Sequence, residues 1–256
     1  MNRLFSLEGK VAIVTGGNGG IGKGVAQGFA AMGADIAIVA RNQEKTDSAA
    51  EEIRSEFGVR VQGVVFDVAR EEQVRKMAAG VLDEFGRIDI LVNNAGINIR
   101  KMPQEFTMDE WDSVLSGNLR SAFMCSNAVY AAMKSVGGGK IINIGSMTSI
   151  FGGAKLATYG ASKGGIVQMA RSIACAWAPD NIQVNSILPG WIDTEMTQQA
   201  RRDIPGLNER VASRTPAGRW GETKDLIGAA IFLASSASDF VTGVALPVDG
   251  GFSIGM

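Results

Sequence analysis

Short runs of apolar residues alternate with longer amphipathic segments along the chain. The runs are rich in Val and Ile and are bounded by Gly, Asp or Asn, which is typical of buried strands. The predicted strands are Val11–Thr15, Ile36–Ala40, Val61–Phe66, Ile88–Val92, Lys140–Ile144, Gln183–Leu188 and Val244–Val248. The predicted helices are Gly20–Met32, Gln43–Phe57, Glu71–Phe85, Trp111–Val136, Tyr159–Ala178 and Asp225–Leu233. Strict alternation predicts an α/β fold: a Rossmann-like, doubly wound parallel sheet with helices on both faces.

One segment, residues 193–216, breaks this alternation. It is polar and basic in patches, and it shows no regular period. Irregular segments of this length inside compact domains are usually lids or disordered. Because this one follows the carboxyl end of a strand, where α/β proteins bind ligands, a substrate lid is favoured. No linker or repeat interrupts the remainder, so residues 1–256 are expected to form a single domain.

The bulk composition narrows the class of protein. Apolar residues make up 46% and charged residues 20%, and the net charge of −1 argues against a nucleic-acid partner, which needs a basic stripe. No run approaches the ~20 apolar residues of a membrane span, and the amino terminus lacks the apolar core of a signal peptide. Cys125 and Cys175 form no disulfide framework. We therefore expect a cytoplasmic protein without nucleic-acid or membrane partners.

The chain contains no histidine, and this restricts its chemistry. A Ser-His-Asp triad, a His-activated cysteine and a His-ligated metal are all excluded. Two cysteines are too few for a zinc or iron–sulfur cluster, so no metal site is expected. Any proton chemistry must then be carried by Tyr, Lys, Asp or Glu.

Tyr159 and Lys163 stand four residues apart, and Ser146 precedes the tyrosine. In a helix, positions i and i+4 share a face, so the phenol and the ammonium would point the same way. A free tyrosine titrates near pH ~10, and a cation beside it lowers that pKa. A lowering of roughly three units corresponds to about 4 kcal/mol, which a close ammonium plus a charged cofactor can supply. The spacing predicts acid/base catalysis by Tyr159; the alternative is a buried tyrosine beside a solvated lysine.

A glycine-rich turn lies between the first predicted strand and the first predicted helix. Glycines let the backbone approach a pyrophosphate, and the helix start offers unpaired N–H groups to its charge. The spacing is G-x-x-x-G-x-G rather than the familiar G-x-G-x-x-G. In this position it predicts a dinucleotide site, with a simple tight turn as the alternative. The candidate cofactor contacts here are Gly16, Asn18, Gly20, Ile21 and Gly22.

The end of the second strand bears on the choice of cofactor. NAD sites usually place a carboxylate there to bind the ribose 2′-hydroxyl. Here Ala40 ends the strand and Arg41 and Asn42 follow, while Asp35 lies at the opposite end. A guanidinium can pair with a 2′-phosphate, although it can also stack on the adenine. We expect NADP to be preferred over NAD.

Together these motifs resemble the short-chain dehydrogenase/reductase family, in its compact single-domain branch. The resemblance runs from about Leu7 to Gly251. It implies an oxidoreductase that interconverts a secondary alcohol and a ketone by hydride transfer, with a tyrosine as acid/base. The motifs that carry it are Thr15–Gly22, Asp67, Asn93–Gly96, Asn118, Ser146, Tyr159-x-x-x-Lys163, and Pro189–Gly190 leading to Thr194.

The resemblance implies a catalytic set of Asn118, Ser146, Tyr159 and Lys163. Ser146 would hydrogen-bond the substrate oxygen, and Lys163 would also bind the nicotinamide ribose. Asn118 would hold a water that relays protons to Lys163. As alternatives, Asn118 could mend a break in its helix, and Ser146 could cap the next segment.

The resemblance also implies cofactor contacts at several places along the chain. Asp67 and Val68 would contact the adenine, Asn94 would border the cleft, and Ile192 and Thr194 would bind the carboxamide. The aspartate could instead cap the next helix, and the asparagine could belong to a turn alone. The remaining implied contacts are Ala95, Gly96, Pro189 and Gly190.

Several basic residues are candidate substrate contacts. Arg100 and Lys101 follow the fourth strand and should overhang the cleft, with Trp191 as a further contact. Together with Arg201 and Arg202 of the lid they could hold a carboxylate by bidentate contacts, or they could be solvated surface charges.

Two short strings, residues 216–221 and 234–239, are similar to those of the family's gluconate and keto-deoxygluconate dehydrogenases. We expect a small-molecule substrate, a sugar acid or polyol. The alternatives are a reductase of 3-oxoacyl chains on a carrier protein and a non-catalytic cofactor-binding sensor. The resemblance makes the helices Trp111–Val136 and Tyr159–Ala178, which are rich in small residues, a subunit interface of a homotetramer; ordinary core helices have the same composition.

Overall fold

The seven apolar runs form the strands of one parallel sheet in a computed structural model, which describes residues 2–255. The strand order is β3-β2-β1-β4-β5-β6-β7, and every neighbouring pair is parallel. The order reverses between β1 and β4, and doubly wound sheets bind ligands beyond the carboxyl ends of the strands at such a point. The strands are β1 (Val11–Thr15), β2 (Asp35–Ala40), β3 (Val61–Val65), β4 (Ile90–Asn93), β5 (Gly139–Ile144), β6 (Ile182–Pro189) and β7 (Ala245–Val248).

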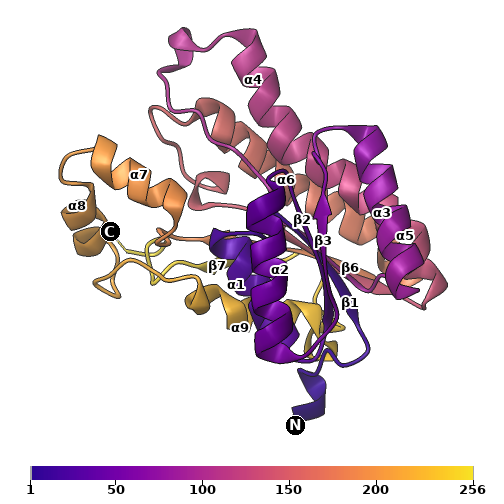
Figure 1. Cartoon of the computed structure of the whole chain (residues 1–256). Coiled ribbons are helices and arrows are strands. Elements are labelled where there is room, and N and C mark those ends of the chain that lie inside the picture. Colours follow the sequence, from indigo (N-terminus) through magenta and orange to yellow (C-terminus); the bar gives the residue numbers. More distant parts are fainter. Residues whose placement is uncertain (1, 256) are drawn as a thin grey trace.

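Helices cover both faces of this sheet (Figure 1). One face is covered by α1, α2 and α9, and the other by α3, α5 and α6. The predicted doubly wound α/β fold is confirmed. The helices are α1 (Gly20–Ala31), α2 (Gln43–Phe57), α3 (Glu71–Phe85), α4 (Met108–Leu115), α5 (Ser121–Ser135), α6 (Ala157–Trp177), α7 (Glu195–Asp203), α8 (Leu207–Arg214) and α9 (Lys224–Ala234).

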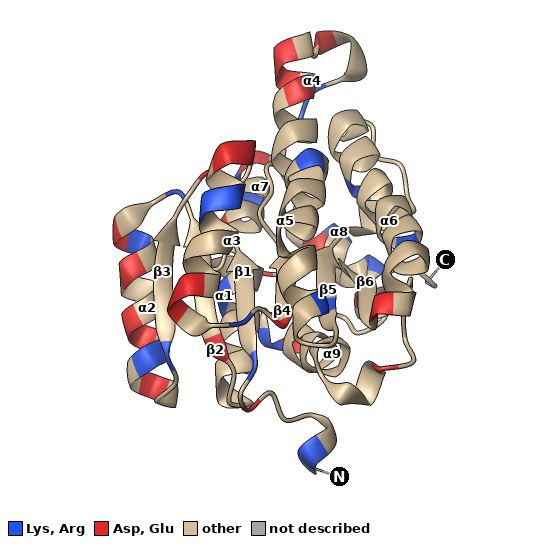
Figure 2. Cartoon of the chain, turned by 90° about the vertical axis from the view of Figure 1, so that its right-hand side faces the viewer, with Lys and Arg blue, Asp and Glu red and all other residues tan. Residues whose placement is uncertain are grey.

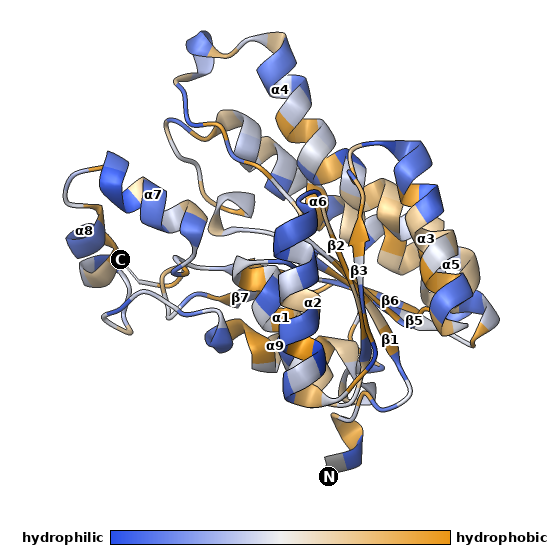
Figure 3. Cartoon of the chain, in the orientation of Figure 1, coloured by the Kyte–Doolittle hydropathy of each residue, from blue (hydrophilic) through white to orange (hydrophobic). Residues whose placement is uncertain are grey.

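The strands are apolar on both sides because two separate cores enclose them. Successive residues of a strand face opposite ways. Ala12 and Val14 of β1 therefore join the buried cluster beneath α1, α2 and α9, whereas Val11 and Ile13 join the cluster beneath α3, α5 and α6. Figure 3 shows the resulting layers, with apolar strands inside and largely hydrophilic α2 and α7 outside.

We expected segment 193–216 to be irregular, and this was wrong: it contains the helices α7 and α8. Each helix is short, with nine and eight residues, and mostly polar, so the apolar period is too weak to stand out in the sequence. Figure 1 shows both helices at the left of the molecule, apart from the helices that cover the sheet. Their apolar side chains pack in a small separate cluster that comprises Ala200, Leu207 and Val211, with Trp191, Ile204 and Trp220 packed against it.

The predicted helix Trp111–Val136 is divided into α4 and α5. It also begins earlier than predicted, because Thr107 and Glu110 form a capping box in which each side chain accepts a backbone N–H of the other. A π-helical turn, Ser116–Arg120, separates the two helices. Single π turns within helices are frequent at functional sites, and this one contains Asn118.

Charged residues are distributed unevenly over the outer helices. Figure 2 shows many on α2 and α3 and few on α5 and α6. Within residues 2–255, no helix combines the length and the apolar character needed to cross a membrane.

Candidate active site

The glycine-rich turn is braced against the end of β4. Thr15 Oγ1 donates to the carbonyl of Val92 (3.1 Å) and accepts from the backbone N–H groups of Asn94 (3.0 Å) and Ala95 (3.1 Å). Asn94 Nδ2 in turn donates to the carbonyls of Thr15 (3.0 Å) and Gly16 (3.1 Å). Asn94 therefore holds the turn in place. Thr15 does the same; the sequence included it in the motif Thr15–Gly22 but did not show that its hydroxyl makes these bonds.

The backbone of this turn forms a cradle that only glycines permit. Gly16 (φ +64°) and Gly20 (φ +51°) adopt the left-handed conformation. A Cβ on Gly22 would lie 2.3 Å from the carbonyl oxygen of Gly16. Helix α1 starts at Gly20, and its N-cap Gly19 has no side chain, so no side-chain cap accepts from the first N–H groups of the helix. These groups fit the pyrophosphate of a dinucleotide.

The ends of β2 and β3 meet beside this turn, where the adenosine of a dinucleotide would lie. Arg41 is exposed and forms no ion pair with any described residue. Asn42 is the N-cap of α2, where its Oδ1 accepts from the N–H of Lys45 at 2.9 Å. Asp67 does not cap α3; its Oδ1 accepts from the N–H of Ala69 at 3.0 Å, and the half-buried Val68 packs on the core.

Asn118 is buried in the π turn, and its amide makes three hydrogen bonds. Its Oδ1 accepts from the N–H of Ile97 (2.8 Å), and its Nδ2 donates to the carbonyl of Ile97 (3.0 Å) and to Ser162 Oγ (3.0 Å). The side chain thus ties the loop after β4 to helix α6. A Cβ on Gly96 would lie 3.1 Å from Asn118 Oδ1 and 3.7 Å from Lys163 Nζ, so this glycine lets the two side chains approach each other.

Tyr159 and Lys163 lie in the first turns of α6, which begins at Ala157. The ammonium of Lys163 lies 5.7 Å from the centre of the Tyr159 ring and donates to the carbonyl of Ile144 at 2.7 Å. Only 3% of Lys163 is exposed, and this burial lowers its pKa to about 8. The lysine is therefore buried and not solvated, which contradicts the alternative drawn from the spacing.

The direction of the Tyr159 pKa differs from our prediction. Burial raises it above its ordinary value, and this outweighs two smaller effects that lower it: a hydrogen bond with Ser146 and the charge of Arg100. The spacing of Tyr159 and Lys163 indicates a nearby cation, but it does not show how deeply the phenol is buried. In the protein alone, Tyr159 is therefore a neutral phenol near neutral pH.

Ser146 both caps a turn and faces the tyrosine. Its Oγ accepts from the N–H of Thr148 (3.1 Å) and so caps the short 3₁₀ turn Met147–Ser149, and its hydroxyl opposes the rise in the Tyr159 pKa. Ser149, at the end of that turn, accepts from the N–H of Ser146 (3.2 Å) and donates to the carbonyl of Lys163 (2.8 Å). The turn after β5 is thereby bound to α6, and Ser149 is a positioning residue that the sequence did not reveal.

The loop after β6 closes the site from the other side. A Cβ on Gly190 would lie 2.7 Å from the Cα of Asp249, so the loop, which starts at Pro189, runs against the end of β7. Ile192 is buried and pairs with Gly221 in a parallel bridge. Thr194 caps α7, and its methyl carbon lies 3.5 Å from the position of a Cβ on Gly20. The loop thus reaches the glycine-rich turn, residues 15–22, which we name the phosphate turn.

Comparison with known proteins agrees with this geometry. A family model described as enoyl-(acyl carrier protein) reductase matches residues 16–253. Gluconate 5-dehydrogenase from Gluconobacter oxydans is 40% identical over 99% of this chain and 98% of that protein. 2-Dehydro-3-deoxy-D-gluconate 5-dehydrogenase from Escherichia coli is 44% identical over 97% of each. The chain belongs to the short-chain dehydrogenase/reductase family.

A solved structure of the same family superposes over almost the whole chain. It is a gluconate 5-dehydrogenase from Burkholderia cenocepacia in complex with NADP and tartrate, 42% identical, with a TM-score of 0.95 and coverage of 100% of this chain and 99% of that one. As a short-chain dehydrogenase/reductase, the protein is an NAD(P)-dependent oxidoreductase that acts on CH–OH groups.

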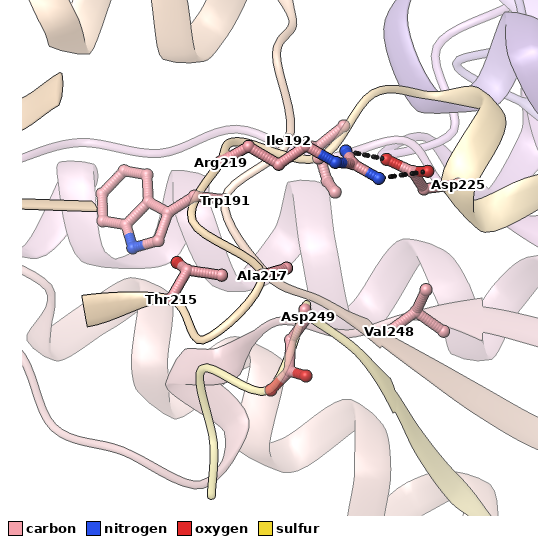
Figure 4. A pocket seen from close by; sticks show the side chains of 11 residues that line it. Trp191, Ile192, Thr215, Ala217, Arg219, Asp225, Val248 and Asp249 are labelled. Atoms are coloured by element: carbon pink, nitrogen blue, oxygen red, sulfur yellow. Dashed lines mark hydrogen bonds and ion pairs between the residues drawn. The ribbon is translucent and has the colours of Figure 1, made fainter. Parts of the chain in front are cut away.

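A pocket of about 230 Å³ has a lining that includes none of Asn118, Ser146, Tyr159 and Lys163. Figure 4 shows Trp191 and Ile192 on one side of it and Asp249 on another. Arg219, on its wall, is held by two hydrogen bonds to Asp225, at 2.7 and 3.0 Å. The pocket is thus lined by the loop after β6 and by the segment that leads to α9.

The four basic residues predicted to clamp a carboxylate do not act as a group. Lys101 pairs with Glu110 at 2.5 Å. Arg201 pairs with Asp193 at 2.5 Å and stacks over Trp220. Arg202 is exposed and donates to the side chain of a neighbouring glutamine. Each of these three cations contacts a partner within nine residues of it in the sequence, and the sequence alone does not show such pairings.

Arg100 is the exception. Its guanidinium forms no ion pair with any described residue, and the Cζ atom of that group lies 6.0 Å from the centre of the Trp191 ring. Trp191 in turn meets Trp220 edge to face at 5.3 Å. Arg100 is exposed, and its charge acts on Tyr159.

Proposed function

We propose that this member of the family interconverts a sugar acid and its keto acid at a secondary alcohol, with NADP preferred over NAD. The observation that carries the substrate class is Arg100. It is an exposed, unpaired cation among the described residues, it stacks beside Trp191, and it lies close enough to Tyr159 to influence its pKa. A carboxylate bound there would place a neighbouring hydroxyl toward the phenol. The relatives named above, whose names specify gluconates, support the same class.

The chemistry assigned to the side chains follows from their contacts. Tyr159 would take the proton of the substrate hydroxyl in oxidation and return it in reduction, while Ser146 holds the same oxygen by a hydrogen bond. Lys163, with a pKa of about 8, is mainly charged at neutral pH, and its charge favours the phenolate. Bound nicotinamide would supply the hydride acceptor and, when oxidised, a positive charge that opposes the effect of burial on the Tyr159 pKa. Asn118 would order a water beside Lys163.

The cofactor would lie along the carboxyl edge of the sheet. The start of α1 and the turn Gly16–Gly22 would hold the pyrophosphate. Asp67 and Val68 would meet the adenine, and the segment from Pro189 to Thr194 would meet the carboxamide. An arginine rather than a carboxylate after β2 supports NADP. The relative from Burkholderia cenocepacia is in complex with that cofactor.

At the scale of the chain, we infer one domain spanning residues 1–256, with 193–216 as a lid made of α7 and α8. We further infer a cytoplasmic homotetramer. The low charge of α5 and α6 supports an interface there, as does a groove of about 410 Å³ that is lined by α4, the π turn, α6 and the half-exposed Phe123 of α5.

The substrate class is tested by Arg100→Ala in initial-rate assays with NADP. The panel holds gluconate and related sugar acids, matched neutral sugars, simple secondary alcohols and a 3-oxoacyl thioester. Loss of a charge-assisted hydrogen bond should raise the KM for a sugar acid about tenfold or more. Arg100→Lys should restore part of the loss, because a lysine keeps the charge and loses the bidentate fork.

The KM for neutral sugars should stay unchanged in both variants. Equal effects on acidic and neutral substrates would refute the role of Arg100. Turnover of the thioester alone would replace the sugar acid with a carrier-bound acyl chain as the substrate.

A further inference from the structure

Three segments that are distant in the sequence meet beside the proposed adenosine site. Asn18 Nδ2, in the phosphate turn, donates to Thr46 Oγ1 of α2 at 3.2 Å. Lys45 Nζ, also of α2, donates to both carboxylate oxygens of Glu195 at 3.2 and 3.4 Å. The start of α7 also lies against the phosphate turn, since Thr194 lies next to Gly20. The first turn of α7 is thus linked to the phosphate turn and to the start of α2.

Lys45 lies where a second cation could reach the 2′-phosphate. It is the third residue of α2, four positions after Arg41, and its N–H is held by the Asn42 cap. The Lys45 and Glu195 side chains are 59% and 87% exposed, so their ion pair is weak and accessible to a competing anion.

The start of helix α7, where Glu195 lies, does not depend on the ion pair with Lys45. It is the first residue of α7, where a helix start favours a carboxylate, and Thr194 caps the helix independently. Removing the ion pair therefore leaves α7 intact.

We propose that Lys45 is a second ligand of the 2′-phosphate of NADP and that Glu195 competes with that phosphate for it. The proposal rests on the NADP preference proposed above. A phosphate with nearly two negative charges displaces one exposed carboxylate, whereas NAD, which has a hydroxyl there, leaves the ion pair unbroken. Glu195 thus lowers the affinity for NADP selectively, and the 2′-phosphate is sensed at the first turn of the lid.

The test is a double-mutant cycle on cofactor binding, which needs no turnover. Dissociation constants for NADPH and NADH are measured by calorimetry at low ionic strength, where exposed charges are least screened. The proteins are the natural chain, Lys45→Gln, Glu195→Gln and the double variant. Lys134→Gln is the control, because Lys134 is equally exposed, pairs with Asp180 at 2.8 Å, and lies at the carboxyl end of α5, at the opposite edge of the sheet.

Lys45→Gln should weaken NADPH binding about fivefold, and Glu195→Gln should strengthen it about two- to fivefold. Neither variant should change NADH binding. In the Lys45→Gln background, Glu195→Gln should have no effect, because the competition has been removed. The control should bind both cofactors as the natural chain does.

Two results would overturn the proposal. One is that Lys45→Gln changes the dissociation constants of NADPH and NADH by the same factor, or leaves both unchanged. The other is the same gain from Glu195→Gln with and without Lys45, which would indicate only a general effect of charge. The variant Arg41→Ala shows which claim has failed, the role of Lys45 or the NADP preference proposed above. If it weakens NADPH binding and Lys45→Gln does not, only the present inference fails; if neither does and NADH binds more tightly, the NADP preference itself is wrong.

Discussion

At the scale of single residues, burial decides the properties of the site more than spacing does. The sequence shows that Tyr159 and Lys163 share a helix face, and the structure agrees. The sequence does not show that burial lowers the pKa of Lys163 and raises that of Tyr159. It also does not show that Arg100 lies beside Trp191, 91 residues further along the chain. These properties depend on neighbours from distant parts of the chain, and a motif does not report them.

The pKa of Lys163 predicts a dependence of stability on pH. Its value in the folded protein is about 8, below the ordinary value of 10.5. Below pH 8 both the folded and the unfolded chain carry the ammonium, so the full cost of burying the charge is present. Between pH 8 and 10.5 the folded chain loses its proton first and the cost disappears.

Lys163→Met removes this cost at every pH. Its gain in the free energy of unfolding over the natural chain should be about 2 kcal/mol larger at pH 7 than at pH 9.5. Urea unfolding at the two pH values measures the difference, and Lys134→Met, at an exposed lysine, is the control and should show no such gain. A gain for Lys163→Met that is the same at both pH values would mean that Lys163 titrates normally.

At the scale of elements, turns and short helices position the site. The strands and long helices were predictable because their apolar periods are strong. Helices α7 and α8 were not, since each is short and buries few side chains: Ala200 in α7, and Leu207 and Val211 in α8. The π turn at Asn118 was also not predictable, because nothing in its composition distinguishes it from the helix around it.

The phosphate turn allows a matched pair of substitutions. Gly22→Ala places a Cβ 2.3 Å from the Gly16 carbonyl, whereas Gly19→Ala meets nothing within 4 Å. We expect Gly22→Ala to lower the free energy of unfolding by roughly 1–3 kcal/mol through steric strain. Gly19→Ala should leave it within about 0.5 kcal/mol of the natural value. Urea unfolding of both variants checks this, and equal stabilities would mean that the turn can open without cost.

At the scale of the whole molecule, the parallel sheet and the helices on both of its faces followed from the alternation of strand and helix, whereas the strand order came from the structure. The association of subunits did not, because small residues on α5 and α6 serve a core and an interface equally well. Phe123→Glu, at a half-exposed position of α5 in the groove that α4, the π turn and α6 also line, should break the proposed tetramer. Light scattering after gel filtration measures the mass. Leu82→Glu, at an exposed apolar residue of α3, is the control and should remain tetrameric; a mass unchanged by Phe123→Glu would place the interface elsewhere.

The central claim is that Tyr159 exchanges a proton with the substrate during hydride transfer, and Tyr159→Phe tests it most directly. The variant removes one hydroxyl and keeps the ring. Turnover of the best sugar-acid substrate with NADP should fall by about 10²–10⁴-fold, while NADPH binding measured by calorimetry stays unchanged. Retention of turnover within about tenfold would contradict the account. Absence of turnover in the natural chain, with cofactor binding intact, would make the protein a sensor.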